Sequence, residues 1–188
     1  CCKDKVAFAE NFHVIETYAN MLHQPVLVEP VGNGFVQINP SYPPASQAEM
    51  DSFWDLPFTK LPHPRYKGKH IPAFEMIKFS VNTHRGCFGG CNFCTIAAHQ
   101  GKFIQERSEE SILKEIKALN DLPGFAGNIS DVGAPTANMY GMHGKDPELC
   151  AKCRRKSCLF PSPCRNMDRS HERLLKLYAQ IAKIKGIR

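Results

Sequence analysis

Three cysteines lie close together in the chain, at Cys87, Cys91 and Cys94. Their C-x3-C-x2-C spacing suits a cubane [4Fe–4S] cluster in which three thiolates each hold one iron and the fourth iron has no protein ligand. An open metal position is a reactive one, as in catalytic zinc sites. The spacing therefore predicts an iron–sulfur cluster that takes part in chemistry.

Zinc is the main alternative for these thiols, followed by a redox disulfide and by inert buried cysteines. Structural zinc usually takes its ligands in two C-x2–4-C pairs that lie far apart in the sequence. Glycines stand among and before the thiols, at Gly86, Gly89 and Gly90. Because glycine tolerates positive φ and lets the backbone approach a bulky inorganic core, these residues favour the cluster over zinc.

A second group of cysteines lies within an expected Cys-rich loop at 147–168 and consists of Cys150, Cys153, Cys158 and Cys164. Four thiols this close in sequence could close a tetrahedral zinc site or hold an auxiliary iron–sulfur cluster without an open position. Free or redox-active thiols are the alternative, and the sequence does not choose the metal. Neighbouring cations would stabilise thiolates in every case; they are Lys152, Arg154, Arg155 and Lys156.

The length and the cysteine count bound the class of protein. The 188 residues suffice for one domain or for parts of two. No apolar stretch approaches the roughly 18 residues that span a bilayer, and no basic and apolar leader opens the chain, so we expect a cytoplasmic protein without a membrane partner. Nine cysteines, an odd number that falls into groups, favour metal ligation in a reducing compartment over a disulfide scaffold.

The charge of the chain is uneven. From Cys150 onward there are eleven Lys and Arg residues and two acids. Such a segment could contact nucleic acid, but it lacks the interleaved aromatic and basic residues of a recognition module, so this partner has no support from the sequence. We expect solvated helix faces instead.

Residues 1–39 are expected to form the end of an α/β region. Apolar residues recur at helical spacing over 3–22 and predict an amphipathic helix that covers a surface, and short apolar runs at 25–29 and 35–38 predict two strands. Residues 40–72 contain seven prolines and predict a connector with at most one short helix, near 48–56. Its large apolar side chains are expected to pack: Phe53, Trp54, Leu56 and Phe58.

Residues 73–188 are expected to form the first part of a catalytic core. An apolar run at 74–81 predicts a strand before the cysteine loop, and Ser108 predicts the N-cap of a helix after it. With a second strand expected within 125–132, the order is that of a βαβ unit, whose parallel strands carry catalytic loops at their carboxyl ends. A last helix over 170–185 is expected to bury Leu174, Leu175, Tyr178, Ile181 and Ala182.

The cysteine motif, with the aromatic Phe93 before its last thiol, resembles the signature of radical S-adenosylmethionine (SAM) enzymes. Four stretches are similar to the YgiQ-type family of radical SAM proteins, namely residues 79–91, 99–101, 107–112 and 133–140. The resemblance implies an α/β fold in which the chain supplies the first part of a parallel (β/α) partial barrel, after the end of an N-terminal region and a Pro-rich connector. Because family members are much longer, we expect an internal fragment.

The resemblance also implies an activity. Radical SAM enzymes bind SAM at the open iron of a [4Fe–4S] cluster and cleave it reductively to a 5′-deoxyadenosyl radical, which acts on a substrate that is unknown here. Phe93 would pack near the adenine, and the turn of Gly133, Ala134 and Pro135 would pass close to the amino end of SAM. Because the turn departs from the common Gly-Gly-Glu-Pro form, only its backbone contact is carried over. An electron donor such as flavodoxin or ferredoxin is the implied partner.

Other roles fit single features of the sequence. His99 and Tyr140 are candidate donors of a proton or hydrogen atom, with a structural role as the alternative, and Arg85 is either a charge beside the cluster or a surface residue. An iron–sulfur electron carrier would need four protein ligands for each cluster. A zinc-stabilised nucleic-acid-binding module would be colourless and would bind RNA with a steep salt dependence.

Overall fold

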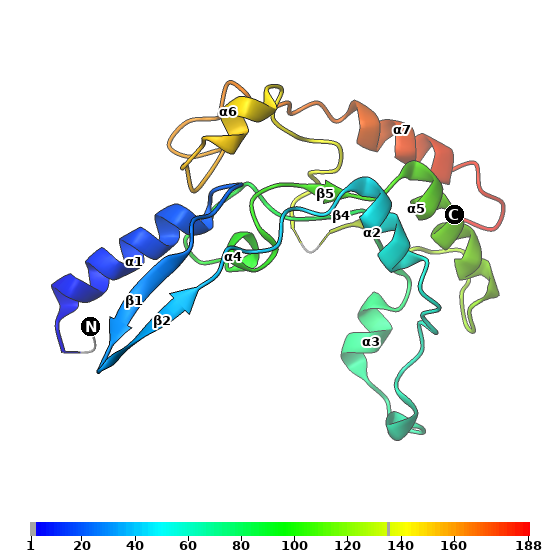
Figure 1. Ribbon diagram of the computed structural model, residues 1–188. Helices are drawn as coiled ribbons and strands as arrows, with labels where there is room; N and C mark the ends of the chain where they lie inside the picture. The colour runs from blue at the N-terminus through cyan, green and yellow to red at the C-terminus, as the bar shows by residue number, and fades with distance from the viewer. Residues whose placement is uncertain (1–2, 135) are drawn as a thin grey trace. The chain divides into compact units, whose positions relative to one another are not determined.

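A computed structural model describes residues 3–134 and 136–188 (Figure 1). The chain divides into two compact units, and each is described by itself. We call them the cysteine unit, with residues 1–44, 86–104 and 142–169, and the core unit, with residues 45–85, 105–141 and 170–188. Each unit consists of three separate stretches of the chain, whereas each predicted segment is one continuous stretch.

A parallel pair of strands lies in the core unit. β3 (Ser80–Asn82) pairs with β6 (Asp131–Gly133), and the helix α5 (Glu109–Ala118) lies between them in sequence. The predicted order of strand, helix and parallel strand is therefore confirmed. Two further strands, β4 (His84–Arg85) and β5 (Gln105–Glu106), form a short antiparallel pair. The unit is thus mixed α/β.

The hydrophobic core of this unit lies between helices. α5, the 3-10 turn η2 (Leu119–Asp121) and α7 (Glu172–Ile181) contribute most of it, and Val81 and Tyr140 are buried against them. The buried residues on each helix share one face; together with η2 they are Ile112, Ile116, Leu119, Leu174, Leu177 and Ile181.

The prediction that Leu175 lies on the buried face of α7 is wrong. Leu175 is 63% exposed, while Leu177 is fully buried. Leu177 lies three residues after Leu174 and four before Ile181, so it shares their face of the helix, whereas Leu175 is turned about 100° away from Leu174. Ala182 is also exposed. The helical repeat therefore places Leu177 in the core, whereas apolar character alone does not distinguish Leu177 from Leu175.

The start of α5 follows from its sequence. The Oγ of Ser108 accepts a hydrogen bond from the backbone N–H of Ser111 at 3.0 Å, which confirms the predicted N-cap. Glu109 and Glu110 stand in the first turn, where their charges complement the helix dipole.

Two predicted strands are much shorter than expected. Half of 74–81 belongs to the helix α3 (Pro72–Ile77), and the strand begins only at Ser80. Proline suits the first turn of a helix, where a missing N–H needs no partner, and a short apolar run does not distinguish helix from strand. Within 125–132, Gly127 has a φ of +91° and interrupts the extended backbone, so β6 begins at Asp131.

The connector contains more local structure than predicted. α2 (Gln47–Trp54) lies near the expected position, but the 3-10 turn η1 (Pro64–Tyr66) follows, so the expectation of at most one short helix is wrong. The ring of His63 accepts the backbone N–H of Arg65 at 3.2 Å and caps this turn. Local side-chain caps of this kind do not appear in apolar periodicity.

Few apolar residues hold the connector. Met50 is buried, and the ring of Trp54 carries two guanidinium groups, those of Arg85 at 5.6 Å and Arg107 at 5.0 Å from its centroid. Contrary to the prediction, the other large apolar side chains are exposed: Phe53, Leu56 and Phe58.

Arg107 is the most buried cation of the core unit among the described residues, at 1% exposure. Its guanidinium donates to the carbonyl of Asn82 at 2.7 Å and to that of Ser111 at 2.9 Å, and it forms an ion pair with Glu115. The hydroxyl of Tyr140 donates to the Arg107 carbonyl at 3.1 Å. Because an unpaired buried charge would cost several kcal/mol, these partners are what allow Arg107 to join β3 to α5.

The cysteine unit begins with elements that confirm the predicted helix and strands. α1 (Lys5–Ala19) is followed by β1 (Leu27–Val31) and β2 (Gly34–Ile38), which pair antiparallel (Figure 1). The amide of Asn11 donates to Glu29 at 2.7 Å and joins the helix to the hairpin. The helix does not cover a surface as predicted, because its apolar side chains are exposed: Phe8, Phe12 and Ile15. No helix in the described ranges is long and apolar enough to cross a membrane.

His84 is fully buried at the start of β4. Its Nδ1 lies 2.8 Å from the hydroxyl of Thr83, and its Nε2 has no hydrogen-bond partner within the described part of the chain. Burial disfavours the imidazolium and lowers the pKa of His84 from 6.5 to about 4. The ring is therefore neutral at physiological pH.

The pH dependence of stability should report this ring. Since the unfolded chain binds a proton near pH 6.5 and the folded chain only near pH 4, stability is greatest above pH 6.5 and falls as the pH is lowered to about 4, by up to about 3 kcal/mol. Urea unfolding at several pH values should show this slope, and His84→Gln should reduce it. The exposed His70→Gln is the control; an equal loss of slope there would contradict the assignment to His84.

The register of α7 can be tested with two leucines on the same helix. Leu177→Ala should lower the free energy of unfolding by about 2–5 kcal/mol, because it leaves a cavity in the core. Leu175→Ala should change it by less than about 1 kcal/mol, because that side chain is exposed. Urea denaturation followed by circular dichroism measures both, and equal losses would contradict the register.

Candidate functional site

The three cysteines of the motif lie on a loop of the cysteine unit that is closed at its base. The backbone N–H of Cys87 donates to the carbonyl of Gly101 at 3.0 Å, and that of Gly86 donates to the side chain of Gln100 at 3.2 Å. The short helix α4 (Ile96–Gln100) lies between these two ends. Gly86 has a φ of +93°, and a Cβ there would come within 2.2 Å of the Phe103 carbonyl oxygen. Only glycine fits this closure.

Two of the thiols face the same point of the loop. The Sγ atoms of Cys87 and Cys91 lie 3.4 and 3.6 Å from the position that a Cβ on Gly89 would occupy. The backbone N–H of Cys94 donates to the Cys91 carbonyl at 3.1 Å and brings the third cysteine back toward the second. All three thiols are free, and none is fully buried. Soft thiolate ligands around a glycine fit an iron–sulfur cluster.

The structure places no single-ion site among these thiols. Within the ranges 3–134 and 136–188, no three His, Cys, Asp or Glu side chains lie close enough together to hold one metal ion. The ligands of a cubane bind separate irons, whereas those of zinc surround one ion.

A second segment packs against the cysteine loop. The hydroxyl of Ser157 donates to the carbonyl of Gly89 at 2.6 Å, and the backbone N–H of Cys158 donates to the carbonyl of Phe88 at 3.0 Å. Gly90 has a φ of +61°, and a Cβ there would lie 2.8 Å from the Lys156 carbonyl oxygen. Phe88 and Ser157 are both buried. Ser157 therefore holds the loop in place, although sequence reasoning did not single it out; the only hint was its position next to a cysteine.

The second group of cysteines surrounds this contact. Cys150 lies near the end of the short helix α6 (Pro147–Ala151), and the Cys153 N–H donates to the Cys150 carbonyl at 3.1 Å. The Cys164 N–H donates to the Cys158 carbonyl at 2.7 Å and folds the segment back on itself. Burial raises the pKa of the Cys150 and Cys158 thiols.

Lys102 connects the two cysteine segments and was also missed from the sequence. It is 5% exposed, and its Nζ donates to the carbonyl of Arg155 at 2.8 Å. The same ammonium lies 3.7 Å from the Sγ of Cys153. The basic residues that sequence reasoning had placed among the thiols contribute less here, since Lys152 and Arg154 are exposed.

The glycine turn that resembles a SAM contact belongs to the core unit. The carbonyl of Gly133 accepts the Thr83 N–H at 2.6 Å and the Thr83 hydroxyl at 3.1 Å. A Cβ on Gly133 would lie 2.6 Å from the Oδ1 of Asn138, so a side chain there would require Asn138 to move. Ala134 is buried, and Pro135, the third predicted residue of the turn, lies outside the described residues.

The remaining candidate site residues differ in how exposed they are. Phe93 is 91% exposed and available for stacking. Tyr140 is buried, and burial raises its pKa to about 12, so its hydroxyl stays protonated and serves the core through Arg107. Arg85 lies over Trp54, as described above, and His99 is exposed on α4.

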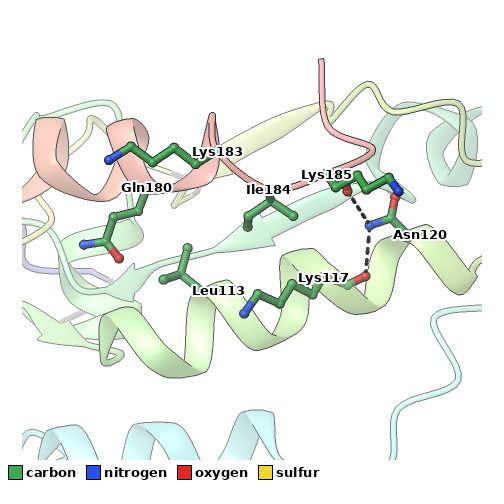
Figure 2. Close-up of a pocket in the computed structure, with 7 residues that line it drawn as sticks. All are labelled: Leu113, Lys117, Asn120, Gln180, Lys183, Ile184 and Lys185. Atoms are coloured by element: carbon green, nitrogen blue, oxygen red, sulfur yellow. Dashed lines mark hydrogen bonds between the residues drawn. The ribbon is translucent and has the colours of Figure 1, made fainter.

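The core unit also contains a hollow. It is formed by α5, α7 and the chain after α7, where Asn120 donates to the carbonyls of Lys117 at 3.2 Å and Lys185 at 3.4 Å (Figure 2). Its lining includes three lysines and no predicted site residue. It carries no argument for catalysis.

Comparisons with known proteins agree with the motifs. Residues 1–80 match a family model described as Radical SAM N-terminal. The chain is 54% identical over its full length to a UPF0313 protein of Bacteroides thetaiotaomicron and 51% identical over 97% of its length to one of Porphyromonas gingivalis. It is 47% identical over 98% of its length to the UPF0313 protein YgiQ of Escherichia coli K12. No solved structure matches the chain.

These relatives are much longer than the chain. It spans 30%, 29% and 25% of the three proteins, respectively. Their similarity extends over both cysteine groups, since it covers nearly all of the 188 residues. It confirms the resemblance of the chain to the YgiQ-type family of UPF0313 proteins.

Proposed function

We propose that the chain holds the cluster of a radical SAM enzyme and contributes to the binding of SAM. Cys87, Cys91 and Cys94 would ligate a [4Fe–4S] cluster and leave one iron open. When bound, the cluster supplies the electron that cleaves SAM to a 5′-deoxyadenosyl radical, which abstracts a hydrogen atom from a substrate. The match to a Radical SAM N-terminal family supports this class of chemistry.

The observation that carries the proposal is the closed loop with free thiols. The thiols of Cys87 and Cys91 both lie close to Gly89, and the loop is fixed at Gly86 and Gly90 by backbone contacts that exclude a side chain. A loop fixed before the cofactor arrives loses little conformational entropy when it binds. Cys91 is exposed and Cys87 and Cys94 are partly exposed, so the thiols are accessible for assembly.

Other residues of the chain would bind and orient SAM. Phe93 presents its ring to solvent and could stack on adenine. The Gly133 turn is fixed by two hydrogen bonds from Thr83, so its backbone is available in one conformation. We assign Tyr140 a structural role, because its hydroxyl is buried and engaged with Arg107.

The wider context of the site is part of the same proposal. We propose that β3 and β6 are the first strands of a parallel partial barrel, since their pairing and the intervening α5 are the unit from which such barrels are built. A small electron-transfer protein such as flavodoxin or ferredoxin would reduce the cluster in the cytoplasm. The substrate is left unassigned.

The central test is anaerobic reconstitution with iron and sulfide. The protein should gain a cluster whose reduced electron paramagnetic resonance (EPR) spectrum changes when SAM is added, and dithionite should then yield 5′-deoxyadenosine. A cluster that ignores SAM would contradict the radical SAM proposal and favour an electron carrier, while a colourless protein that binds zinc alone would contradict both.

Single replacements separate the cluster from the SAM contact. Cys87→Ser, Cys91→Ser and Cys94→Ser should each lower the EPR signal of the SAM-responsive cluster about tenfold, because no other thiol stands at the right spacing. Phe93→Leu should keep the EPR signal of this cluster and weaken its SAM-dependent change about tenfold, as expected for loss of stacking on a base. A SAM-responsive cluster retained by the three serine variants would overturn the ligand assignment.

The fixed loop makes a prediction about Gly90. Gly90→Ala should reduce the EPR signal of the SAM-responsive cluster several-fold although all thiols remain, because a methyl group would collide with the backbone at Lys156. Gly101→Ala is the matched control, since its φ is +81° but no atom lies within 4 Å of the added carbon. If the two variants lose this signal equally, backbone strain alone explains the effect and the contact at Lys156 does not matter.

A further inference from the structure

The second cysteine group is built more like a metal site than a set of free thiols. The segment folds back on itself through two backbone hydrogen bonds, from the Cys153 N–H to the Cys150 carbonyl and from the Cys164 N–H to the Cys158 carbonyl. Two of the sulfurs already accept N–H groups: Cys150 from the Asn166 amide at 3.3 Å and Cys153 from Lys102 at 3.7 Å. Donors aimed at sulfur stabilise thiolates much more than neutral thiols, and they are a known feature of metal–thiolate centres.

The backbone also approaches one of these sulfurs closely. A Cβ on Gly144 would lie 2.2 Å from the Sγ of Cys150, so a side chain at this position would displace the thiol. The neighbouring Asn166 accepts the Asp146 N–H at 2.9 Å and donates to the Asp146 carbonyl at 2.9 Å. The side chain of Asn166, which donates to Cys150, is therefore held in place by the backbone of Asp146.

Lys102 supplies the charge that such a centre requires. Its ammonium is almost fully buried, and no ion pair with a carboxylate is found for it in the part of the chain that the structure describes. Burying a cation without an anion is costly. The thiol of Cys153, whose Sγ lies 3.7 Å from this ammonium, can become an anion. Four thiolates around Zn²⁺, or around a cubane core of charge +2, leave a net charge of about −2, which a buried ammonium partly offsets.

We propose that Cys150, Cys153, Cys158 and Cys164 form a second, closed thiolate site for zinc or an iron–sulfur cluster, with Lys102 as its buried counter-ion. Binding releases the thiol protons to solvent and changes no oxidation state of the protein. As they stand, no three of these sulfurs lie close enough to hold one ion, so loading must draw the segment closer together. The site would also brace the first loop through Ser157 and Cys158.

This proposal does not depend on the proposed function, and its test removes the first site. The triple variant Cys87→Ser, Cys91→Ser, Cys94→Ser is loaded anaerobically, in one arm with zinc alone and in the other with iron and sulfide. After gel filtration, metal analysis should find about one zinc or about four irons per chain. Further replacement of Cys150 or Cys158 by serine should lower that content about tenfold. No stoichiometric metal in either arm, or binding that ignores these serines, would overturn the site.

Two measurements cover the case in which the triple variant does not fold. In the protein with all cysteines intact, zinc or iron loading should protect these four thiols from iodoacetamide, as read by peptide mass spectrometry. Lys102→Met should weaken metal retention against a chelator about tenfold, the effect of losing a supporting contact, and Lys102→Arg should restore most of it. Lys152→Met removes an exposed charge from the same segment and should have little effect. Unprotected thiols would overturn the site, and equal effects of the two methionine variants would overturn the role of Lys102.

Discussion

The cysteine loop depends on the satisfaction of its backbone hydrogen bonds. Most of the loop lies outside helices and strands, so its peptide groups need partners elsewhere, because a buried backbone group without one is costly. The carbonyls of Phe88 and Gly89 find them in Cys158 and Ser157. Seventy residues of chain separate the two sides, so the ligand loop keeps its shape only when the second cysteine segment is folded against it. The same segment leaves no room for a side chain at Gly90, where a Cβ would lie 2.8 Å from the Lys156 carbonyl oxygen.

The core unit solves a similar problem with buried polar side chains. Thr83 and Arg107 both contact strand backbone, at Gly133 and Asn82 respectively, and so extend the very short parallel pair beyond its own ladder. A pair of three-residue strands has few hydrogen bonds of its own, and isolated short pairs are marginal in water. The apolar contacts of α5 and α7 stabilise the pair from one side, and the polar contacts fix its ends. The backbone at Gly133 is thereby held without a long sheet.

The proximity of the two cysteine groups gives the basic residues distinct roles. Lys102, in the first segment, is buried beside the thiols, whereas Lys152 and Arg154, in the second, face solvent. A buried ammonium acts on a nearby sulfur far more strongly than an exposed one, because water screens the latter. The electrostatic effect of a basic residue on a thiol is therefore predicted less well by its distance along the sequence than by its distance in space. The eleven basic residues after Cys150 say little about the electrostatics of the site for the same reason.

The sequence by itself determined the features that depend on neighbouring residues: the helix that starts at Ser108, the hairpin near the N-terminus, the order of strand, helix and parallel strand, and the motif that identified the family. It did not determine that Pro72 starts a helix inside an apolar run, that Leu177 rather than Leu175 faces the core, or that Phe53 and Phe58 stay exposed. Caps and turns are local, since one side chain bonds a backbone group a few residues away. Burial and the partners of Ser157 and Lys102 depend on segments far apart in the chain, which only tertiary packing brings into contact.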